Sequence, residues 1–101
     1  MTFRLTTTKR ADDDIRAIAR YIFADNAIAA GRFTGEIWQA FRLIAEQPDI
    51  GRAVTGFEAL RAIRVSARFR RYHVIYRRLD HETVEVVRIW HSARDIARLF
   101  E

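Results

Sequence analysis

Three β-rich segments in the last third of the chain decide its fold, and arginine recurs in each of them. They are Leu60-Arg61-Ala62-Ile63-Arg64-Val65, Arg71-Tyr72-His73-Val74-Ile75-Tyr76 and Val86-Val87-Arg88-Ile89-Trp90. Because β-branched and aromatic residues favour the pleated, half-buried surface of a sheet, each segment predicts a strand. We expect these strands at Leu60–Ser66, Phe69–Arg78 and Thr83–Trp90, with a tight turn over residues 79–82.

The first half of the chain predicts two amphipathic helices. Thr8 is a suitable N-cap, acidic residues follow it, and isoleucines then recur at helical spacing as far as Asp25. A second apolar stripe with the same spacing runs from Ile28 to Gln47, and Pro48 ends it. The short connection between the two helices predicts an antiparallel hairpin.

Weaker signals complete the fold prediction. Alternating apolar and polar residues at 3–6 predict a first strand, 49–58 is expected to be a loop, and 93–101 predicts a short final helix. Gly31 and Gly35, one turn apart in the second helix, are expected to allow close approach of the first helix. The element order predicts an α+β fold, with the N-terminal strand and the helix hairpin packed on one face of a small antiparallel sheet.

The length and composition exclude several classes of protein. A chain of 101 residues has room for one hydrophobic core, so we expect a single domain over residues 1–101. With no cysteine, disulfides, zinc–thiolate sites and thiol nucleophiles are excluded. The N-terminus lacks the apolar region of a signal peptide, and no stretch is long enough to span a membrane. We therefore expect a cytoplasmic protein without a membrane partner.

The positive charge is concentrated in the C-terminal part. Residues 60–101 contain ten arginines and five acidic residues, whereas residues 1–59 contain eight basic and eight acidic residues. The net charge of +5 therefore comes from the β-rich part, which indicates an acidic partner. Lys9 is the only lysine, and arginine offers a planar fork suited to phosphate and carboxylate. Codon usage in a high-GC genome is an alternative reason for the bias, but it does not explain the location.

The last two strands bring cations together on one face of the sheet. If residues 80–81 form the turn, His73 lies opposite Arg88, and Arg71 lies opposite Trp90. These four side chains face away from the helices and form a candidate site for phosphate or carboxylate. The alternative is a solvated sheet face. The opposite face is apolar and is expected to pack on the helices: Tyr72, Val74, Tyr76, Val87 and Ile89.

Other candidate residues have simpler interpretations. His91, just after the last strand, is a candidate general base or hydrogen-bond donor, or a cap for the final helix. His81 lies in a turn and is expected to be solvated. The run Asp12-Asp13-Asp14 directs its carboxylates to different sides of a helix, so a solvated helix start is expected rather than a metal site. No phosphate-binding loop, metal motif or Ser-His-Asp arrangement is recognisable.

In their order along the chain, these features resemble the RelE/ParE superfamily of type II toxin–antitoxin toxins, the ParE branch most closely. The resemblance covers essentially the whole chain and includes the β-rich segments quoted above. It also includes Ala11-Asp12-Asp13-Asp14-Ile15, Leu43-Ile44-Ala45-Glu46-Gln47-Pro48, Gly51-Arg52 and His91-Ser92-Ala93-Arg94-Asp95.

The resemblance implies one of two activities. RelE-type toxins cut mRNA on the ribosome with Lys and Arg side chains and, in some members, a tyrosine on the final helix, whereas ParE-type toxins poison DNA gyrase. At the matching positions this chain retains Arg94 but has His73 in place of an arginine and Phe100 in place of the tyrosine. Arg64 and Ser66 replace the usual lysines. Because arginine stays protonated, only a histidine is available here to accept a proton from a 2′-hydroxyl.

We therefore predict a gyrase poison, neutralised by a cognate ParD-like antitoxin, with no cofactor, metal or small-molecule substrate. The alternatives are a ribosome-dependent mRNA endonuclease, a degenerate or differently targeted toxin, and a simple nucleic-acid-binding domain. Operator DNA is expected to bind only the toxin–antitoxin complex. The predicted target- or anion-binding residues are Arg71, His73, Arg88, Trp90 and Arg94, and the catalytic residues of a nuclease would be His73, His91 and Arg94.

Overall fold

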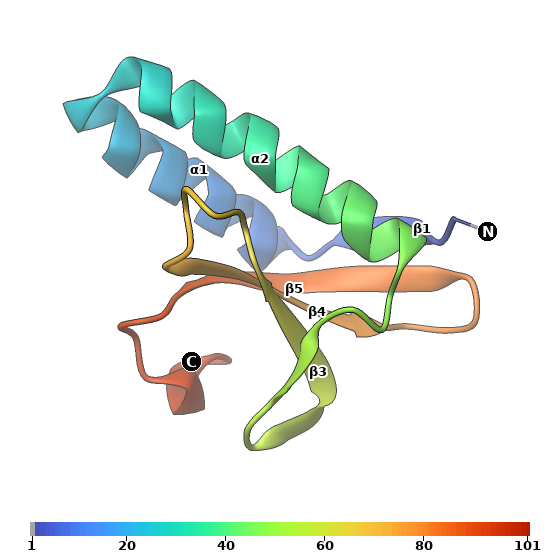
Figure 1. The fold of residues 1–101 in the computed structure, drawn as a ribbon. Coiled ribbons are helices and arrows are strands. Elements are labelled where there is room, and N and C mark those ends of the chain that lie inside the picture. Colours follow the sequence, from blue (N-terminus) through green and yellow to red (C-terminus); the bar gives the residue numbers. More distant parts are fainter. Residues whose placement is uncertain (1) are drawn as a thin grey trace.

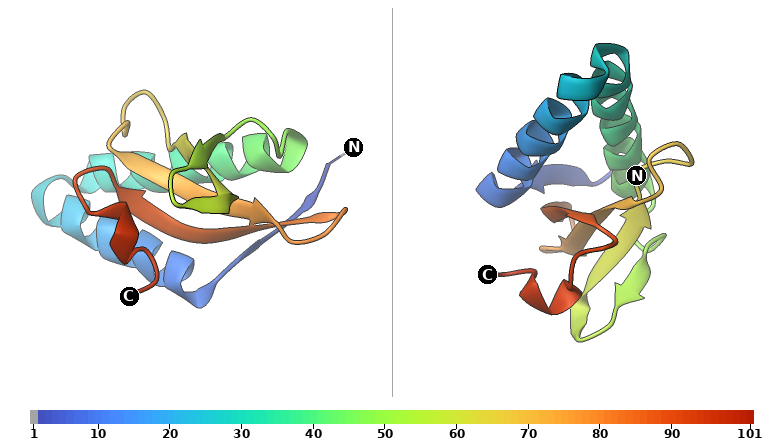
Figure 2. Two further views of the ribbon diagram at one scale, coloured as in Figure 1. Left: turned by 90° about the horizontal axis from the view of Figure 1, so that it is seen from below. Right: turned by 90° about the vertical axis from the view of Figure 1, so that its left-hand side faces the viewer.

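The structure, a computed structural model, describes residues 2–101 as two helices packed on one face of a five-stranded sheet (Figure 1). The helices are α1 (Lys9–Asp25) and α2 (Ala27–Glu46). The strands are β1 (Arg4–Thr7), β2 (Arg52–Val54), β3 (Phe57–Arg64), β4 (Tyr72–Arg78) and β5 (Thr83–His91), in the order β1-β5-β4-β3-β2. Figure 2 shows the C-terminal segment on the face opposite the helices. Among residues 2–101, neither helix has the length and apolar character required to cross a membrane.

The predicted helices and the predicted N-cap at Thr8 are confirmed. Thr8 Oγ1 accepts a hydrogen bond from the Ala11 amide at 3.0 Å. Asn26 separates the helices and serves both, because its amide bonds to the Ile22 carbonyl at 2.8 Å and its side chain accepts from the Ala29 amide at 3.0 Å. One residue that caps two helices explains why the hairpin connection is so short.

The sheet is mixed, so the prediction of an antiparallel sheet was wrong in one respect. β1 pairs in parallel with β5, from Arg4 opposite Thr83 to Thr7 opposite Val86. The other neighbouring strands are antiparallel. Alternation of apolar and polar residues in a four-residue strand identifies the strand but carries no information about its partner or direction.

The main core lies between the helices and the sheet, as the apolar stripes predict. Its α2 members are Phe33, Ile37, Phe41 and Ile44, and the sheet contributes Val74, Tyr76, Val84, Val86 and Ile89. Gly31 and Gly35 play no part in this packing, because a Cβ at either position would meet no atom within 4 Å. The prediction that they bring the helices close was wrong.

A second apolar cluster occupies the opposite face of the sheet. It contains Val54, Leu60, Ile75, Val87, Trp90 and Leu99. Leu99 belongs to the C-terminal segment, which folds back as a single turn of 3-10 helix, Ile96–Arg98, rather than the predicted final helix. Because this turn covers part of the sheet, the face predicted to carry the cationic site contains its own small core.

The segment 49–58 contains strand structure, contrary to the predicted loop. β2 and β3 form a hairpin around residues 55–56, where Gly56 has a φ of +85°, a left-handed conformation that favours glycine. β3 therefore begins at Phe57, three residues earlier than predicted. Gly51 is required by close packing, since a Cβ there would lie 2.7 Å from the hydroxyl of Tyr76, which accepts the Gly51 amide at 2.9 Å.

The β4–β5 pairing differs from the predicted register by two residues. His73 lies opposite Trp90 and Ile75 opposite Arg88, and a bulge then shifts the pairing so that Tyr76 faces Val86. The turn is also longer than predicted, because the Leu79 amide bonds to the Thr83 carbonyl at 2.8 Å. The longer turn and the bulge each shift the register by one residue. A shift of two keeps His73 and Trp90 on the predicted face.

Arg88 and Asp14 form a largely buried ion pair, although both were predicted to be exposed. Arg88 is 5% exposed, and its Nε and Nη2 donate to the Asp14 carboxylate at 2.8 and 3.0 Å. Its Nη1 donates to the Leu99 carbonyl at 2.6 Å, and Asp14 also accepts the Ile89 amide at 3.0 Å. This pair therefore connects α1, β5 and the C-terminal segment.

Substitution of Asp14 tests the importance of this pair. We expect Asp14→Ala to reduce the free energy of unfolding by about 3–5 kcal/mol, because Arg88 would remain buried without its counter-ion. The double variant Asp14→Ala/Arg88→Met should recover most of the loss. The measurement is urea-induced unfolding followed by circular dichroism. The neighbouring Asp13, which pairs with Lys9 at the surface, is the matched control, and Asp13→Ala should leave the free energy of unfolding nearly unchanged.

Candidate anion-binding groove

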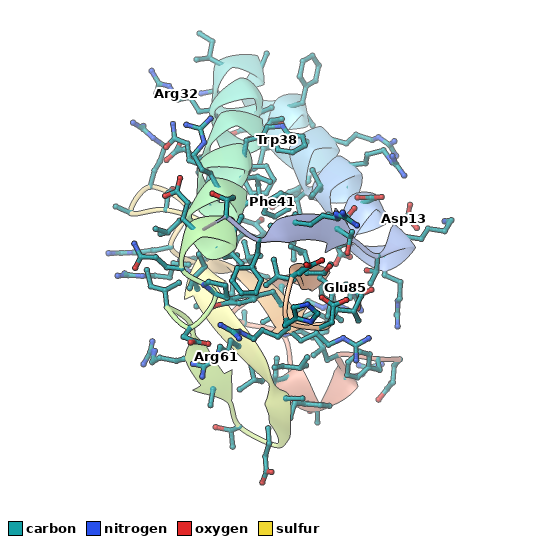
Figure 3. All side chains as sticks on the ribbon, turned by 90° about the vertical axis from the view of Figure 1, so that its right-hand side faces the viewer. Asp13, Arg32, Trp38, Phe41, Arg61 and Glu85 are labelled. Atoms are coloured by element: carbon teal, nitrogen blue, oxygen red, sulfur yellow. The ribbon has the colours of Figure 1, made fainter. Side chains whose placement is uncertain are left out.

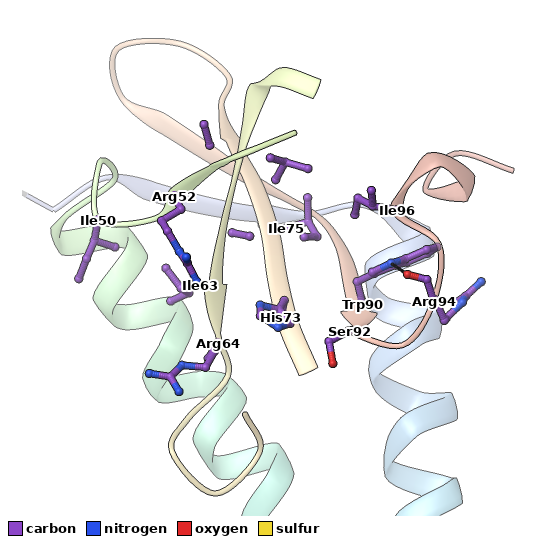
Figure 4. Close-up of a pocket in the computed structure, with 13 residues that line it drawn as sticks. Ile50, Arg52, Ile63, Arg64, His73, Ile75, Trp90, Ser92, Arg94 and Ile96 are labelled. Atoms are coloured by element: carbon purple, nitrogen blue, oxygen red, sulfur yellow. Dashed lines mark hydrogen bonds between the residues drawn. The ribbon is translucent and has the colours of Figure 1, made fainter. Parts of the chain in front are cut away.

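A groove of about 470 Å³ lies on the sheet face opposite the helices, between β2 and the segment that follows β5 (Figure 4). Cationic or titratable side chains enter it from four directions: Arg52 from β2, Arg64 from β3, His73 from β4 and Arg94 from the segment after β5. Its floor is apolar and is formed by Ile50, Ala62, Ile63, Ile75 and Ile96. We refer to this cavity as the cationic groove.

Sheet register places these groups side by side. Arg64 is opposite His73, and His73 is opposite Trp90, so the three residues form one row across β3, β4 and β5. Arg52 is opposite Ala62, two residues before Arg64, and therefore lies on the same face in the adjacent row. Figure 4 shows Arg52 and Arg64 on one side of His73 and Arg94 on the other.

The positive charge of the groove is uncompensated. No aspartate or glutamate lines it, and within residues 2–101 the side chains of Arg52, Arg64 and Arg94 form no ion pair. Arginines elsewhere do have carboxylate partners, such as Arg77 with Glu85 at 3.0 Å. Three guanidinium groups that line one cavity without a counter-ion favour an anionic ligand, because an anion offsets their positive charge.

The environment of the groove changes the pKa of His73. Burial lowers the pKa of His73 below its ordinary value of 6.5, and the positive charges of Arg52 and Arg64, followed by His91, lower it further. Neutral imidazole is therefore the stable form at pH 7. An anion in the groove would act in the opposite direction and favour the protonated form.

Trp90 supports the groove rather than offering a stacking surface. It is 3% exposed and belongs to the second apolar cluster. The Arg94 guanidinium lies 4.0 Å from the centre of its ring, and the indole Nε1 donates to the Arg94 carbonyl at 3.4 Å. Trp90 thus fixes the backbone and the side chain of Arg94 together.

A second cavity, of about 400 Å³, opens on the other side of Arg94, between α1 and the ends of β4 and β5. It is lined by Asp14, Ala17, Ile18, Tyr21, Tyr72, Ile89, His91 and Arg94, and we call it the aromatic slot. Tyr72 and His91 meet edge to face with ring centres 5.0 Å apart. Burial raises the pKa of Tyr72, so its hydroxyl remains protonated.

The structure brings together only some of the predicted site residues. His73, Trp90 and Arg94 do come together in the cationic groove. Arg88 is bound to Asp14, and Arg71 lies exposed in the turn before β4 and does not line the groove. The prediction for Arg71 was wrong because β4 begins at Tyr72 rather than at Phe69, so Arg71 lies outside the strand. The prediction for Arg88 was wrong because its pairing depends on Asp14, a residue far away in sequence.

Arg52 and Arg64 were missing from the predicted anion site. Arg52 was assigned to a loop, although Gly51 before it and Gly56 after it are signals of a hairpin that holds it in a strand. Arg64 lies on a predicted strand, two residues after Ala62. Because residues two apart on a strand share a face, Arg64 and Ala62 both lie on the groove face.

The candidate nuclease residues are distributed over both cavities. His73 opens into the cationic groove and His91 into the aromatic slot, and Arg94 borders both. His91 Nδ1 accepts the Ala93 amide at 3.0 Å, which is the capping role proposed as an alternative, in a turn rather than at a helix. Phe100 packs edge to face on Phe57, with ring centres 5.5 Å apart, and lines neither cavity. Within residues 2–101, His, Asp and Glu side chains form no cluster that could hold a metal ion.

Comparison with known proteins identifies the family. The family model for the ParE toxin of the type II toxin–antitoxin system parDE matches residues 5–96. The chain belongs to the ParE toxin family. The predicted resemblance to the ParE branch of the RelE/ParE superfamily is thereby confirmed. No match was found among curated proteins.

Two solved structures share the fold of this ParE-family toxin. One is the chromosomal ParDE toxin–antitoxin system from P. aeruginosa, with a TM-score of 0.74 and 15% sequence identity, covering 89% of this chain and 96% of that one. The other is the RelBE2 toxin–antitoxin complex from Mycobacterium tuberculosis, with a TM-score of 0.59 and 22% identity, covering 90% of this chain and 99% of that one. At these identities the likeness demonstrates the fold alone.

The lowered pKa of His73 leads to a prediction about how the free energy of unfolding depends on pH. Because the unfolded chain binds this proton more readily than the folded one, we expect His73 to destabilise the fold as the pH falls from about 6.5 toward its lowered pKa. His73→Asn should therefore lose less unfolding free energy than the wild type between about pH 7.5 and 5.5. The measurement is chemical denaturation at both pH values. His81→Asn, in the exposed β4–β5 turn, should behave like the wild type, and equal losses in all three proteins would contradict the assignment.

Proposed function

We propose that this type II toxin poisons DNA gyrase, stabilising cleaved DNA and blocking replication, and that a cognate ParD-like antitoxin neutralises it. The observation that carries the proposal is the match of the ParE toxin family over residues 5–96, nearly the whole chain. The structure adds a chemical argument, because the groups required for RNA cleavage are poorly assembled.

Cleavage of RNA by its own 2′-hydroxyl requires a base for that hydroxyl, an acid for the leaving oxygen and cations for the phosphate. The cationic groove supplies arginines, but among its lining residues within 2–101 only His73 titrates in the neutral range. His91 lines the other cavity, and Phe100 has no hydroxyl and packs on Phe57. A single histidine without a partner acid supports a binding role over a catalytic one.

The second candidate function is a ribosome-dependent mRNA endonuclease. One observation favours it: His73 is held in its neutral form beside Arg52 and Arg64, and neutral imidazole is able to accept a proton next to groups that bind phosphate. In that case His73, His91 and Arg94 are the residues that would carry the reaction.

We further infer that an acidic amphipathic segment of the antitoxin covers the exposed apolar side chains of the helix hairpin. Trp38 is 65% exposed and meets Phe41 edge to face at 5.7 Å, at the wall of a cavity of about 210 Å³ between α1 and α2 (Figure 3). Exposed tryptophan beside a concave apolar surface is typical of interface hot spots. The resulting cytoplasmic complex, rather than the toxin alone, would bind operator DNA.

The decisive experiment combines the purified toxin with gyrase, ATP and supercoiled plasmid. After detergent and protease treatment we expect linear DNA, and we expect none when the toxin is first saturated with its antitoxin. Gyrase without toxin is the control. Intact supercoiling by gyrase and no linear DNA, together with mRNA cut in stalled ribosomes, would contradict gyrase poisoning and support the nuclease.

Antitoxin binding makes a separate prediction. Trp38→Ala should weaken binding of the cognate antitoxin by about 2 kcal/mol or more, whereas its effect on unfolding should be small, because the side chain is mostly in solvent. Isothermal titration calorimetry measures the affinity. Leu79→Ala, an exposed apolar residue just after β4, is the matched control and should bind normally. Equal affinities of the two variants would exclude the Trp38 surface.

A further inference from the structure

The cationic groove and the aromatic slot adjoin at Arg94, and this shared border carries an inference about the ligand. Arg94 lines both cavities, and the last two residues of β5 line one cavity each, Trp90 the groove and His91 the slot. A ligand that follows this path passes from the slot between α1 and the sheet, around Arg94, and into the groove on the opposite face.

The chemistry of the path alternates between cations and aromatic rings. The groove offers Arg52, Arg64 and Arg94 without a counter-ion among residues 2–101. The slot offers Tyr21, which is 70% exposed, beside the Tyr72–His91 pair. The one carboxylate in the slot, Asp14, is already neutralised by Arg88 at 2.8 Å.

We propose that the groove and the slot together bind single-stranded DNA, with phosphates on Arg52, Arg64 and Arg94 and an unpaired base stacked beside Tyr21. Such a site combines a cationic groove that follows the backbone with rings on which bases stack. A polypeptide of acidic residues alone, such as polyglutamate, satisfies the arginines but brings no ring for the slot. A duplex keeps its bases inside the helix, where Tyr21 cannot reach them.

The choice of DNA over RNA rests on the proposed function, since a poisoned gyrase holds cut DNA. The toxin would then contact the DNA of the cleaved complex itself, as well as the enzyme. Binding of DNA by the isolated toxin is measurable without gyrase, so the two proposals can fail independently.

The test is fluorescence anisotropy of the whole toxin with a labelled thymidine oligonucleotide of about ten nucleotides, titrated between about 50 and 200 mM salt. Arg52→Ala/Arg64→Ala should weaken binding and reduce the slope of log affinity against log salt by about 1.4, since each lost contact to a single strand is worth about 0.7. Tyr21→Ala should weaken binding about fivefold or more and leave the slope unchanged, because stacking releases no counter-ion.

Two control variants match these changes. Arg32 is an exposed arginine on α2 that lines neither cavity, and Figure 3 shows it projecting from the helix, so Arg32→Ala should leave the slope unchanged. Phe23 is an exposed aromatic residue two positions after Tyr21 that lies outside the slot, and Phe23→Ala should bind normally. Thermal unfolding by circular dichroism verifies that every variant is folded.

Four results would overturn the inference. The first is that the wild type does not bind the oligonucleotide, and the second is that Arg32→Ala changes binding as much as Arg52→Ala/Arg64→Ala does. The third is that the toxin binds a uridine RNA oligonucleotide more tightly than the thymidine one. The fourth is that polyglutamate displaces the DNA while Tyr21→Ala binds it normally. The last result would assign the groove to an acidic polypeptide. The two proposals are also separated by their outcomes. If the toxin produces linear DNA with gyrase but does not bind the oligonucleotide, the DNA-binding inference is wrong and gyrase poisoning stands. If it binds the oligonucleotide but produces no linear DNA, gyrase poisoning is wrong and the DNA-binding inference stands.

Discussion

The ion pair between Asp14 and Arg88 is the interaction on which the rest of the structure depends. β1 ends at Thr7, so the backbone of β5 beyond Val86 has no neighbouring strand on that side. Side chains of α1 replace the strand: Thr8 Oγ1 donates to the Val87 carbonyl at 2.7 Å, and Asp14 accepts the Ile89 amide at 3.0 Å. Arg88 completes the arrangement by holding Asp14 and the Leu99 carbonyl, which fixes the C-terminal segment on the opposite face.

This arrangement lets a small chain use both faces of its sheet. One face is covered by the helix hairpin and the other in part by the segment around Leu99. The C-terminal segment covers only part of the second face. The uncovered part, between Arg52 and Arg94, is the cationic groove, so the groove exists because the second core is incomplete.

The excess of arginine has two structural roles that composition alone does not separate. Arg88 is a buried structural cation that donates to the Asp14 carboxylate and to the Leu99 carbonyl, and Arg77 is paired across strands with Glu85. Arg52, Arg64 and Arg94 have no such partners within residues 2–101, and they converge on one cavity. Because the self-repulsion of converging guanidinium groups is relieved only by an anion, this second set is the part of the charge that concerns function.

The sequence by itself determined the local elements: caps at Thr8 and Asn26, the apolar stripe from Phe33 to Ile44, and the β-rich segments that place His73 and Trp90 on one face. These features follow from interactions between residues close in the chain. Only the tertiary structure decided the parallel pairing of β1, the bulge at Val87, the burial of Arg88 and the recruitment of Arg52 to the groove. The pairing of β1 and the burial of Arg88 depend on partners far away in sequence, such as Asp14 for Arg88, and local periodicity contains no information about such partners. The bulge and the position of Arg52 depend on how neighbouring strands pair, which alternation within one strand does not specify.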